Sequence, residues 1–315
     1  MGHEHRLTAT PETVHWGWFD AALAPALTVR SGDRVTIETV SGAAHENPPP
    51  GPLAVLPDHA RIQAAVTPEL GPHIMTGPVA VEGAMPGDTL EVRILDVRLR
   101  QDWGWNIQKP LLGTLPEDFP RYRIVHIPLD AARGVATLAF GVRLELAPFF
   151  GVMGVAPPPA YGRISSIEPR EHGGNIDLKE LVAGATLFLP VWAPGALLSV
   201  GDGHACQGDG EVNLTAIETA LTGTFELILH KATGQRWPRA ETPTHLITLG
   251  MDPDLDDAAR QALREMIALL GRRCGLDPED AYMLCSLAAD LRVTQLVDGN
   301  KGIHCMLAKA HLPDG

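Results

Sequence analysis

The chain has 315 residues, a formal net charge of −13 and a hydrophobic content of 45%. A chain of this length can bury a large core and holds either two domains or one elaborate domain. The negative charge excludes nucleic acid and anionic membrane as partners, since both attract basic surfaces. No apolar stretch approaches the roughly 20 residues that cross a bilayer, and the N-terminal segment lacks the apolar run of a signal peptide. The four cysteines are widely spaced without a CxxC pair, which predicts reduced thiols and a cytoplasmic location.

Three segments in the first two thirds of the chain share one pattern, in which two alternating apolar–polar runs flank a glycine turn. They are residues 26–42 with Ser-Gly-Asp, residues 77–97 with Pro-Gly-Asp, and residues 184–204 with Pro-Gly-Ala. Alternation of this kind predicts strands, and the first segment is typical of a hairpin. The second and third copies align well and indicate a duplication within a β-sandwich or barrel architecture. A repeat of turns alone is the alternative.

The last quarter of the chain has a different pattern. Apolar residues between 256 and 274 fall on one helical face. A second helix is predicted to begin after Asp277, which suits the N-cap and precedes a proline. Residues 291–299 and 302–309 then read as two strands. We therefore expect a mainly β protein of duplicated sandwich-like or barrel-like units with a small α+β C-terminal part. The expected domains are 1–165, 166–250 and 251–315, with a single intertwined unit as the alternative.

The stretch "GDGHACQGDGE", Gly201 to Glu211, carries the densest set of reactive side chains. If it ends a strand, Asp202 and His204 share one face, because strand side chains alternate. Two such side chains commonly bind one zinc ion. Gln207, Asp209 and Glu211 repeat the period of two after a bend. The alternative is a cluster of Gly-Asp turns that carries exposed acids.

A zinc site needs further ligands, and histidines supply the candidates. His73 precedes a duplicated strand pair and is the best of them, followed by His45 and then His15. Each of these, taken alone, is more often a surface or satisfied core histidine.

Three other residues have competing explanations. Asp177 with Glu180 makes a capping box for a short helix at 178–181, so a ligand role cannot be separated from a capping role. Glu82 interrupts an apolar strand, either on the solvent face or inside the site. Cys206 could be a nucleophile beside His204, but adjacent strand residues point oppositely, so water attack assisted by a metal is favoured.

Several stretches together resemble the acetamidase/formamidase family, over about residues 8–311. They are "VHWGWFD", "SGDRVTIETVSG", "HIMTGPVAVEGAMPGDTLEVRILDV", "GGNIDLKELVAGATLFLPVWAPGALLSVGDGHACQGDGEV" and "TAIET". The resemblance implies hydrolysis of a short-chain amide to a carboxylate and ammonia. It also implies a mostly β fold of duplicated sandwich-like domains, a divalent metal (zinc, with calcium as a second candidate) and assembly into homodimers or larger homo-oligomers.

The motifs of this family imply a set of site residues. Two of them come from the Gly-Gly-Asn motif, five from the "GDGHACQGDGE" stretch, and His73 precedes "TGP": Asn175, Asp177, Asp202, His204, Gln207, Asp209, Glu211 and His73. The leading hypothesis gives zinc the ligands His73, Asp202, His204 and Asp177.

In this hypothesis Glu211 is the general base, Gln207 a donor to the oxyanion, and Asp209 a further catalytic residue. The alternative is a non-catalytic small-molecule-binding protein whose acidic cluster holds a structural cation. Trp103, Trp105 and the Pro-rich segment 46–58 are expected to line a pocket larger than formamide needs.

Overall fold

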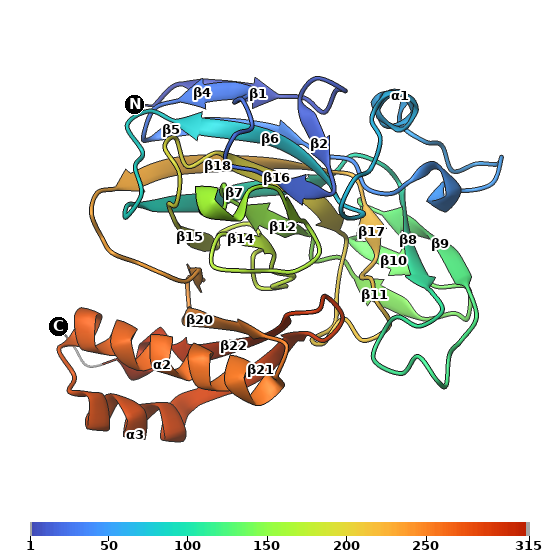
Figure 1. Ribbon diagram of the computed structural model, residues 1–315. Helices are drawn as coiled ribbons and strands as arrows, with labels where there is room; N and C mark the ends of the chain where they lie inside the picture. Colours follow the sequence, from blue (N-terminus) through green and yellow to red (C-terminus); the bar gives the residue numbers. More distant parts are fainter. Residues whose placement is uncertain (1, 313–315) are drawn as a thin grey trace.

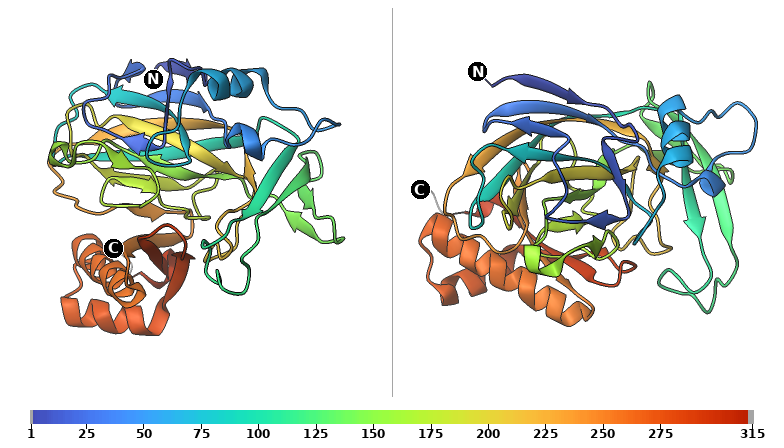
Figure 2. Two further views of the ribbon diagram at one scale, coloured as in Figure 1. Left: turned by 45° about the vertical axis from the view of Figure 1, so that its right-hand side comes forward. Right: turned by 45° about the horizontal axis from the view of Figure 1, so that its top comes forward.

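Two large β-sheets make up most of the protein, which a computed structural model describes over residues 2–312 (Figure 1). The two C-terminal helices lie together at one end of the molecule, beside the last strands, and the first helix lies apart from them (Figure 2). The helices are α1 (Pro57–Ala65), α2 (Leu255–Cys274) and α3 (Pro278–Ala288), with the short 3₁₀ turns Ala44–Glu46, Pro159–Tyr161 and Lys309–His311. The expected mainly β class with a small α+β C-terminal part is confirmed.

The first sheet has nine strands. Their order is β1 (Glu4–Leu7), β5 (Asp33–Glu38), β18 (Leu221–His230), β7 (Thr89–Leu99), β15 (Thr186–Pro190), β19 (Arg239–Glu241), β20 (His245–Asp252), β22 (Lys301–Ala308) and β21 (Ala289–Gln295). The C-terminal strands therefore extend the sheet that the first strands begin.

The second sheet has eleven strands. Its main path is β11 (Arg143–Glu145), β10 (Val135–Thr137), β9 (Arg123–Asp130), β8 (Trp103–Gln108), β17 (Glu218–Thr219), β16 (Leu198–His204), β12 (Phe149–Gly154) and β14 (Gly173–Asn175). β6 (Ile74–Val81) pairs with β16 and also with β2 (Val14–Trp16) and β4 (Leu27–Val29). A separate small sheet joins β3 (Trp18–Phe19) to β13 (Ile164–Ser165).

The three repeated segments form strands, but the predicted hairpin at 26–42 is wrong. β4 joins the eleven-stranded sheet, whereas β5 joins the nine-stranded one, so the glycine turn at Gly32 crosses between sheets. The other two copies also cross: β6 and β7 lie in different sheets, as do β15 and β16. Alternation identifies a strand with one buried face, but it does not identify the neighbouring strand.

The second and third copies pair with each other in both sheets. β6 runs antiparallel to β16, and β7 runs antiparallel to β15. Strands from residues 1–165 and 166–250 thus alternate within the same two sheets. From this interleaving we propose the single intertwined unit that was the alternative to separate domains.

The largest apolar cluster lies between the two sheets. It takes Val35, Leu90 and Phe225 from the nine-stranded sheet, and Phe150 and Val200 from the eleven-stranded sheet. Contact between the two inner faces is the arrangement of a β-sandwich, and it fixes the strand ends on which the candidate site is built.

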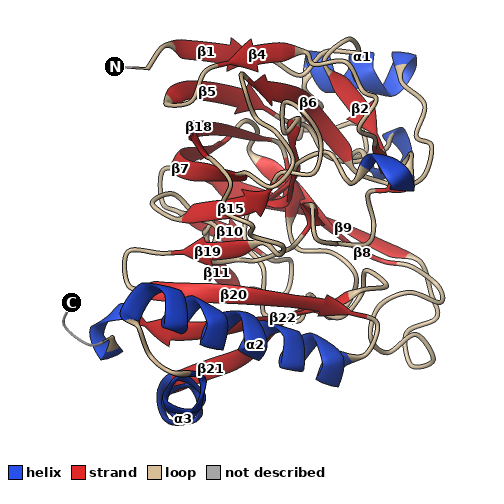
Figure 3. Cartoon of the chain, turned by 60° about the vertical axis from the view of Figure 1, so that its left-hand side comes forward, coloured by secondary structure: helices blue, strands red, loops and turns tan. Residues whose placement is uncertain are grey.

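The C-terminal unit confirms the predicted helices and strands. Asp254 caps α2 and Asp277 caps α3, each accepting two backbone N–H groups. The apolar face of α2 packs on β20 and β22, where Met266 and Leu270 contact the same core as Leu307 (Figure 3). Within the described chain, no helix combines the length and the apolar character that a membrane crossing requires.

Candidate active site

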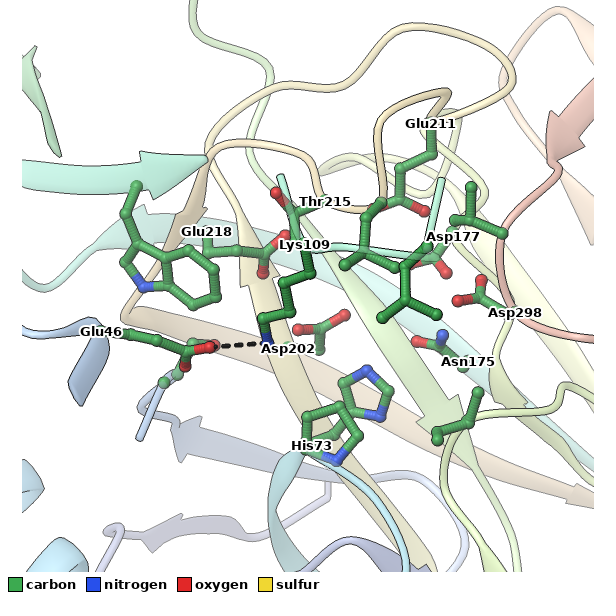
Figure 4. A pocket seen from close by; sticks show the side chains of 18 of the residues that line it. Glu46, His73, Lys109, Asn175, Asp177, Asp202, Glu211, Thr215, Glu218 and Asp298 are labelled. Atoms are coloured by element: carbon green, nitrogen blue, oxygen red, sulfur yellow. Dashed lines mark hydrogen bonds and ion pairs between the residues drawn. The ribbon is translucent and has the colours of Figure 1, made fainter. Parts of the chain in front are cut away.

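Five carboxylates line one cavity of the protein (Figure 4), and His204 lies beside them. Asp177 follows β14, Asp202 and His204 end β16, Glu211 lies in the loop after β16, and Glu218 begins β17. The fifth carboxylate, Asp298, lies in the turn between β21 and β22. Separate parts of the chain, including the C-terminal unit, therefore build this site.

The predicted shared face of Asp202 and His204 is confirmed. His204 Nε2 lies 3.0 Å from Asp202 Oδ2 and 3.2 Å from Glu218 Oε1. Glu218 reaches this position because β17 pairs with β16, with Glu218 directly opposite His204. All three side chains are buried.

Gln207 determines which nitrogen of His204 carries a proton. Its Nε2 donates to the carbonyl of Asp177 at 2.9 Å, so its Oε1 is the atom that faces His204 Nδ1, also at 2.9 Å. Nδ1–H therefore donates to Gln207. The Nε2 atom is left facing Asp202 and Glu218, which is the arrangement of a metal-binding imidazole held by a second hydrogen bond.

The site also shows backbone strain. Asp177, Asp202 and Glu211 have φ angles of 53°, 55° and 45°, a left-handed conformation that non-glycine residues rarely adopt. Such strain persists only where surrounding structure imposes it, and it concentrates at functional sites. The short helix expected after Asp177 is absent from residues 178–181, because this conformation cannot cap a helix and turns the Asp177 side chain inward.

Several buried oxygens at the site have no hydrogen-bond partner among residues 2–312. They are Asp177 Oδ1, Glu211 Oε2, Glu218 Oε2 and Asp298 Oδ2. Unpaired buried carboxylates are costly unless they are protonated or bind a cation. Two overlapping groups have ligand atoms within 4.8 Å of one another: Asp177, His204, Glu211 and Asp202, His204, Glu218. These residues fit a divalent metal ion.

Without a metal, mutual repulsion and burial keep protons on this cluster. Burial, and then the charge of Asp202, raise the pKa of Glu218 to about 8. Burial and the neighbouring Asp177 raise the pKa of Glu211, and likewise that of Asp298, well above the usual range. Burial alone would lower the pKa of His204, but Glu218 and Asp202 raise it well above 6.5.

These shifts predict that metal-free protein loses stability as the pH rises from 7 to 8. In the unfolded chain Glu218 is already ionised at pH 7, whereas the folded state retains its proton up to about pH 8. The folded state then binds more protons, so the free energy of unfolding falls, by about 1 kcal/mol over this pH unit from Glu218 alone. The raised pKa values of Glu211, Asp298 and His204 act in the same direction. The buried histidines His15 and His172 have pKa values of about 4 and 3, so they are neutral in the folded state and change the free energy of unfolding little between pH 7 and 8. Denaturant titration at both pH values measures the fall, which Glu218→Gln should reduce; a flat profile would contradict it.

The carboxylates form one wall of a cavity of about 170 Å³. His73 lines it and is held through Nδ1 by the hydroxyl of Ser166 at 2.8 Å, but it belongs to neither metal group. Lys109 and Glu46 form an ion pair of 3.0 Å at another wall (Figure 4). Trp105 also lines the cavity, as expected.

The remaining expected residues lie elsewhere. Asp209 is 31% exposed, pairs with Lys179 at 3.0 Å and lies outside this cavity, because residues 205–214 form a loop instead of continuing the alternation of β16. Trp103 is fully buried and donates to the carbonyl of Ala54, so it supports segment 46–58 from beneath. Of segment 46–58, only Glu46 reaches the cavity.

Four further candidate side chains also lie outside the cavity lining. His45 is exposed beside Glu46, and Glu82 pairs with Arg30 at 3.4 Å. Burial raises the pKa of the half-buried Cys206 thiol, which is the opposite of nucleophile activation. His15 is buried, with hydrogen bonds to Trp18 and Ser199, as a core histidine would be.

Sequence reasoning gave no role to Glu218 or Asp298. Glu218 lies in the "TAIET" stretch, where only its pairing partner His204 reveals its place. Asp298 lies in "VDGNK", which is an ordinary turn sequence. Only tertiary structure brings these two acids to the site.

Comparisons with known proteins identify one family. The chain matches the Acetamidase/Formamidase family over residues 2–162 and 160–310. It is 30% identical over 200 residues to a formamidase of Methylophilus methylotrophus, covering 47% of this chain and 49% of that protein. It is 29% identical over 203 residues to an acetamidase of Mycolicibacterium smegmatis, covering 45% and 49%. The chain thus spans about half the length of the curated relatives it matches.

A solved structure extends the likeness over the whole fold. The acetamidase of Bacillus halodurans superimposes with a TM-score of 0.84 at 34% identity, covering 97% of this chain and 98% of that one. The family match includes both sheets and every residue of the acidic cluster. The chain therefore belongs to the acetamidase/formamidase family.

Proposed function

We propose that the protein is an amidase that hydrolyses a small amide to a carboxylate and ammonia, with a zinc ion at the acidic cluster. The observation that carries this proposal is His204 Nε2 facing Asp202 and Glu218 at 3.0 and 3.2 Å, with Nδ1 held by Gln207. Ligands about 2.0–2.1 Å from a tetrahedral zinc lie about 3.3 Å apart, close to these separations. An imidazole ligand favours zinc over calcium, which takes oxygen ligands.

In this proposal the expected ligands Asp202 and His204 are retained, and Glu218 completes the set. Asp177 lies beside them, with its Oδ1 3.9 Å from His204 Nδ1. His73 lines the cavity wall and would contact the substrate. When bound, zinc supplies Lewis-acid chemistry, which lowers the pKa of a water ligand toward about 7 and polarises a carbonyl group.

The chain's own residues supply the proton transfer and the positioning. Glu211 extends into the cavity with a buried, unpartnered oxygen and a raised pKa, so it can accept a proton from water and pass it to the leaving nitrogen. Gln207 already uses both ends of its amide on His204 and Asp177. We therefore assign it to positioning instead of the oxyanion role expected of it.

Metal removal tests the proposal. Chelated, metal-free protein is expected to lose ammonia release from small amides and to regain it on addition of zinc. Metal-free protein with full activity would overturn the zinc proposal. Zinc-loaded protein that binds amides without releasing ammonia would favour the non-catalytic binding protein.

The cavity predicts a preference for amides larger than formamide. Its volume of about 170 Å³ compares with roughly 10–15 Å³ for one water on the same measure, so it holds on the order of ten water-sized groups. Each added methylene that the apolar wall covers should raise kcat/KM by about 10-fold or more. A series from formamide through acetamide and propionamide to aromatic amides measures this. A steady fall with size would contradict it.

Leu112 offers a variant for the same series. Leu112 lines the cavity, whereas its neighbour Leu111 is 86% exposed and does not. Leu112→Ala should reduce the preference for larger amides, and Leu111→Ala should leave it unchanged.

We also propose self-association and keep the cytoplasmic location as a prediction. Exposed apolar side chains on the loops between β8 and β9 and between β10 and β11 support self-association: Leu111, Leu115, Phe119, Tyr122, Phe140 and Val142. Single apolar residues on a surface are ordinary, but a group on one projecting region is typical of an interface.

A further inference from the structure

A second group of potential ligands lies outside the lining of the cavity. Glu180, Asp209 and His304 each offer an atom within 4.8 Å of the others. Glu180 lies three residues after Asp177, Asp209 two residues before Glu211, and His304 on β22. The group therefore joins the two loops that carry site carboxylates to the C-terminal unit.

Two atoms of this group are buried and unsatisfied. His304 is fully buried, and its Nε2 points at Glu180 Oε2 across 3.5 Å. Neither atom has a hydrogen-bond partner among residues 2–312. The separation is longer than an ordinary N–H···O bond of about 2.7–3.2 Å, but it matches the spacing of about 3.3 Å between two ligands of a tetrahedral zinc.

The other nitrogen of His304 is already held. Nδ1 lies 2.8 Å from the hydroxyl of Thr294, which can accept its proton. This hydrogen bond orients the ring and leaves the Nε2 lone pair directed at Glu180. The arrangement repeats that of His204 with Gln207, in which one nitrogen is fixed and the other faces carboxylates.

Two cations also face the group and bear on its affinity. Lys179 Nζ lies 3.0 Å from Asp209 Oδ2, and Arg292 lies 3.7 Å from Glu180 Oε1. Each contacts one oxygen of its carboxylate, so Glu180 Oε2 stays directed at His304. Their positive charge repels a metal ion, and we therefore expect weaker binding here than at the cluster around His204.

We propose that Glu180, Asp209 and His304 bind a second zinc ion, with water in the remaining position on the exposed side of Asp209. The same region is already joined by backbone hydrogen bonds, from Gly210 N to Thr294 O at 3.1 Å and from Leu296 N to Gly210 O at 3.0 Å. An ion here holds the loop of Glu211 and the loop of Asp177 against β21 and β22. Its role is to position these loops, not to contact the substrate.

Metal counting tests this proposal independently of amidase activity. Protein titrated with Co²⁺ or Zn²⁺ is expected to bind two equivalents, one tighter than the other. His304→Gln should remove the weaker equivalent, His204→Gln should remove the tighter one, and His245→Gln, at a half-buried histidine outside both groups, should remove neither. A native stoichiometry of one, or two equivalents retained in His304→Gln, would overturn the second site.

Asp209→Asn is a second variant for the case that His304→Gln does not fold. The Asp209 side chain is 31% exposed, so its replacement should disturb the fold less. It should weaken the second equivalent by 10-fold or more and leave the first unchanged. Unchanged binding of both equivalents would refute the assignment. Failure of the proposed amidase activity is a separate result, since it would leave both metal equivalents in place.

Discussion

Glu211→Gln is expected to lower kcat for ammonia release by about 10²–10⁴-fold while zinc content stays unchanged. Glu211 lines the cavity, and its Oε2 is buried without a partner in the described chain. Burial and the adjacent Asp177 raise its pKa well above the usual range, which is the property of a group that holds and releases a proton during turnover. Glutamine keeps the shape of the side chain but cannot transfer the proton.

Two companion variants separate proton transfer from metal binding. Glu117→Gln, the same change at an exposed position, should leave both activity and zinc intact. Glu218→Gln should lose zinc as well as activity, because Glu218 Oε1 lies 3.2 Å from the free nitrogen of His204. If Glu211→Gln also loses zinc, Glu211 is a ligand and not the proton carrier.

The sequence predicted the strands well and their partners poorly. The patterns in residues 77–97 and 184–204 located β6, β7, β15 and β16, and all four strands contribute to the core between the sheets. β6 and β16 are buried on both faces. The same pattern could not reveal that each glycine turn crosses between sheets, since register and partner depend on contacts far along the chain. The helices α2 and α3 were easier to predict, because their caps and apolar faces are formed by residues close together in the sequence.

Local sequence also predicted some residues of the candidate site, and missed those that depend on long-range contacts. Asp202 and His204 are two residues apart on one strand, so their shared face follows from local geometry. Glu211 and Asp209 stand at alternate positions, so the sequence predicted the same location for both. In the structure the loop directs Glu211 into the cavity, whereas Asp209 forms an ion pair with Lys179 outside it. The capping-box pattern at Asp177 predicted a short helix, but the left-handed backbone conformation of Asp177 prevents it. Long-range pairing alone brings Glu218 into the site.

Gly151→Ala is expected to abolish zinc binding at the His204 cluster and to lower kcat/KM by about 100-fold or more. Gly151 lies on β12, beneath the acidic cluster. A Cβ there would stand 2.6 Å from Asp202 Oδ2, 2.8 Å from His204 Cε1 and closer still to Asp177 Oδ1. The missing side chain thus keeps open the space that these three residues surround, and a methyl group would push the ligands apart.

Gly208→Ala is the matched control, because Gly208 lies in the glycine-rich motif of Asp202 and His204, with open space where a Cβ would stand and no left-handed φ. It should keep zinc and activity. Zinc content and amide turnover are measured beside the melting temperature, so that a site effect is distinguished from unfolding. Gly151 has no left-handed φ, so alanine there adds no backbone strain, and any loss comes from the space its methyl group fills. A folded Gly151→Ala protein that still binds zinc and turns over amide would contradict a zinc site that needs the open space beside Asp202 and His204.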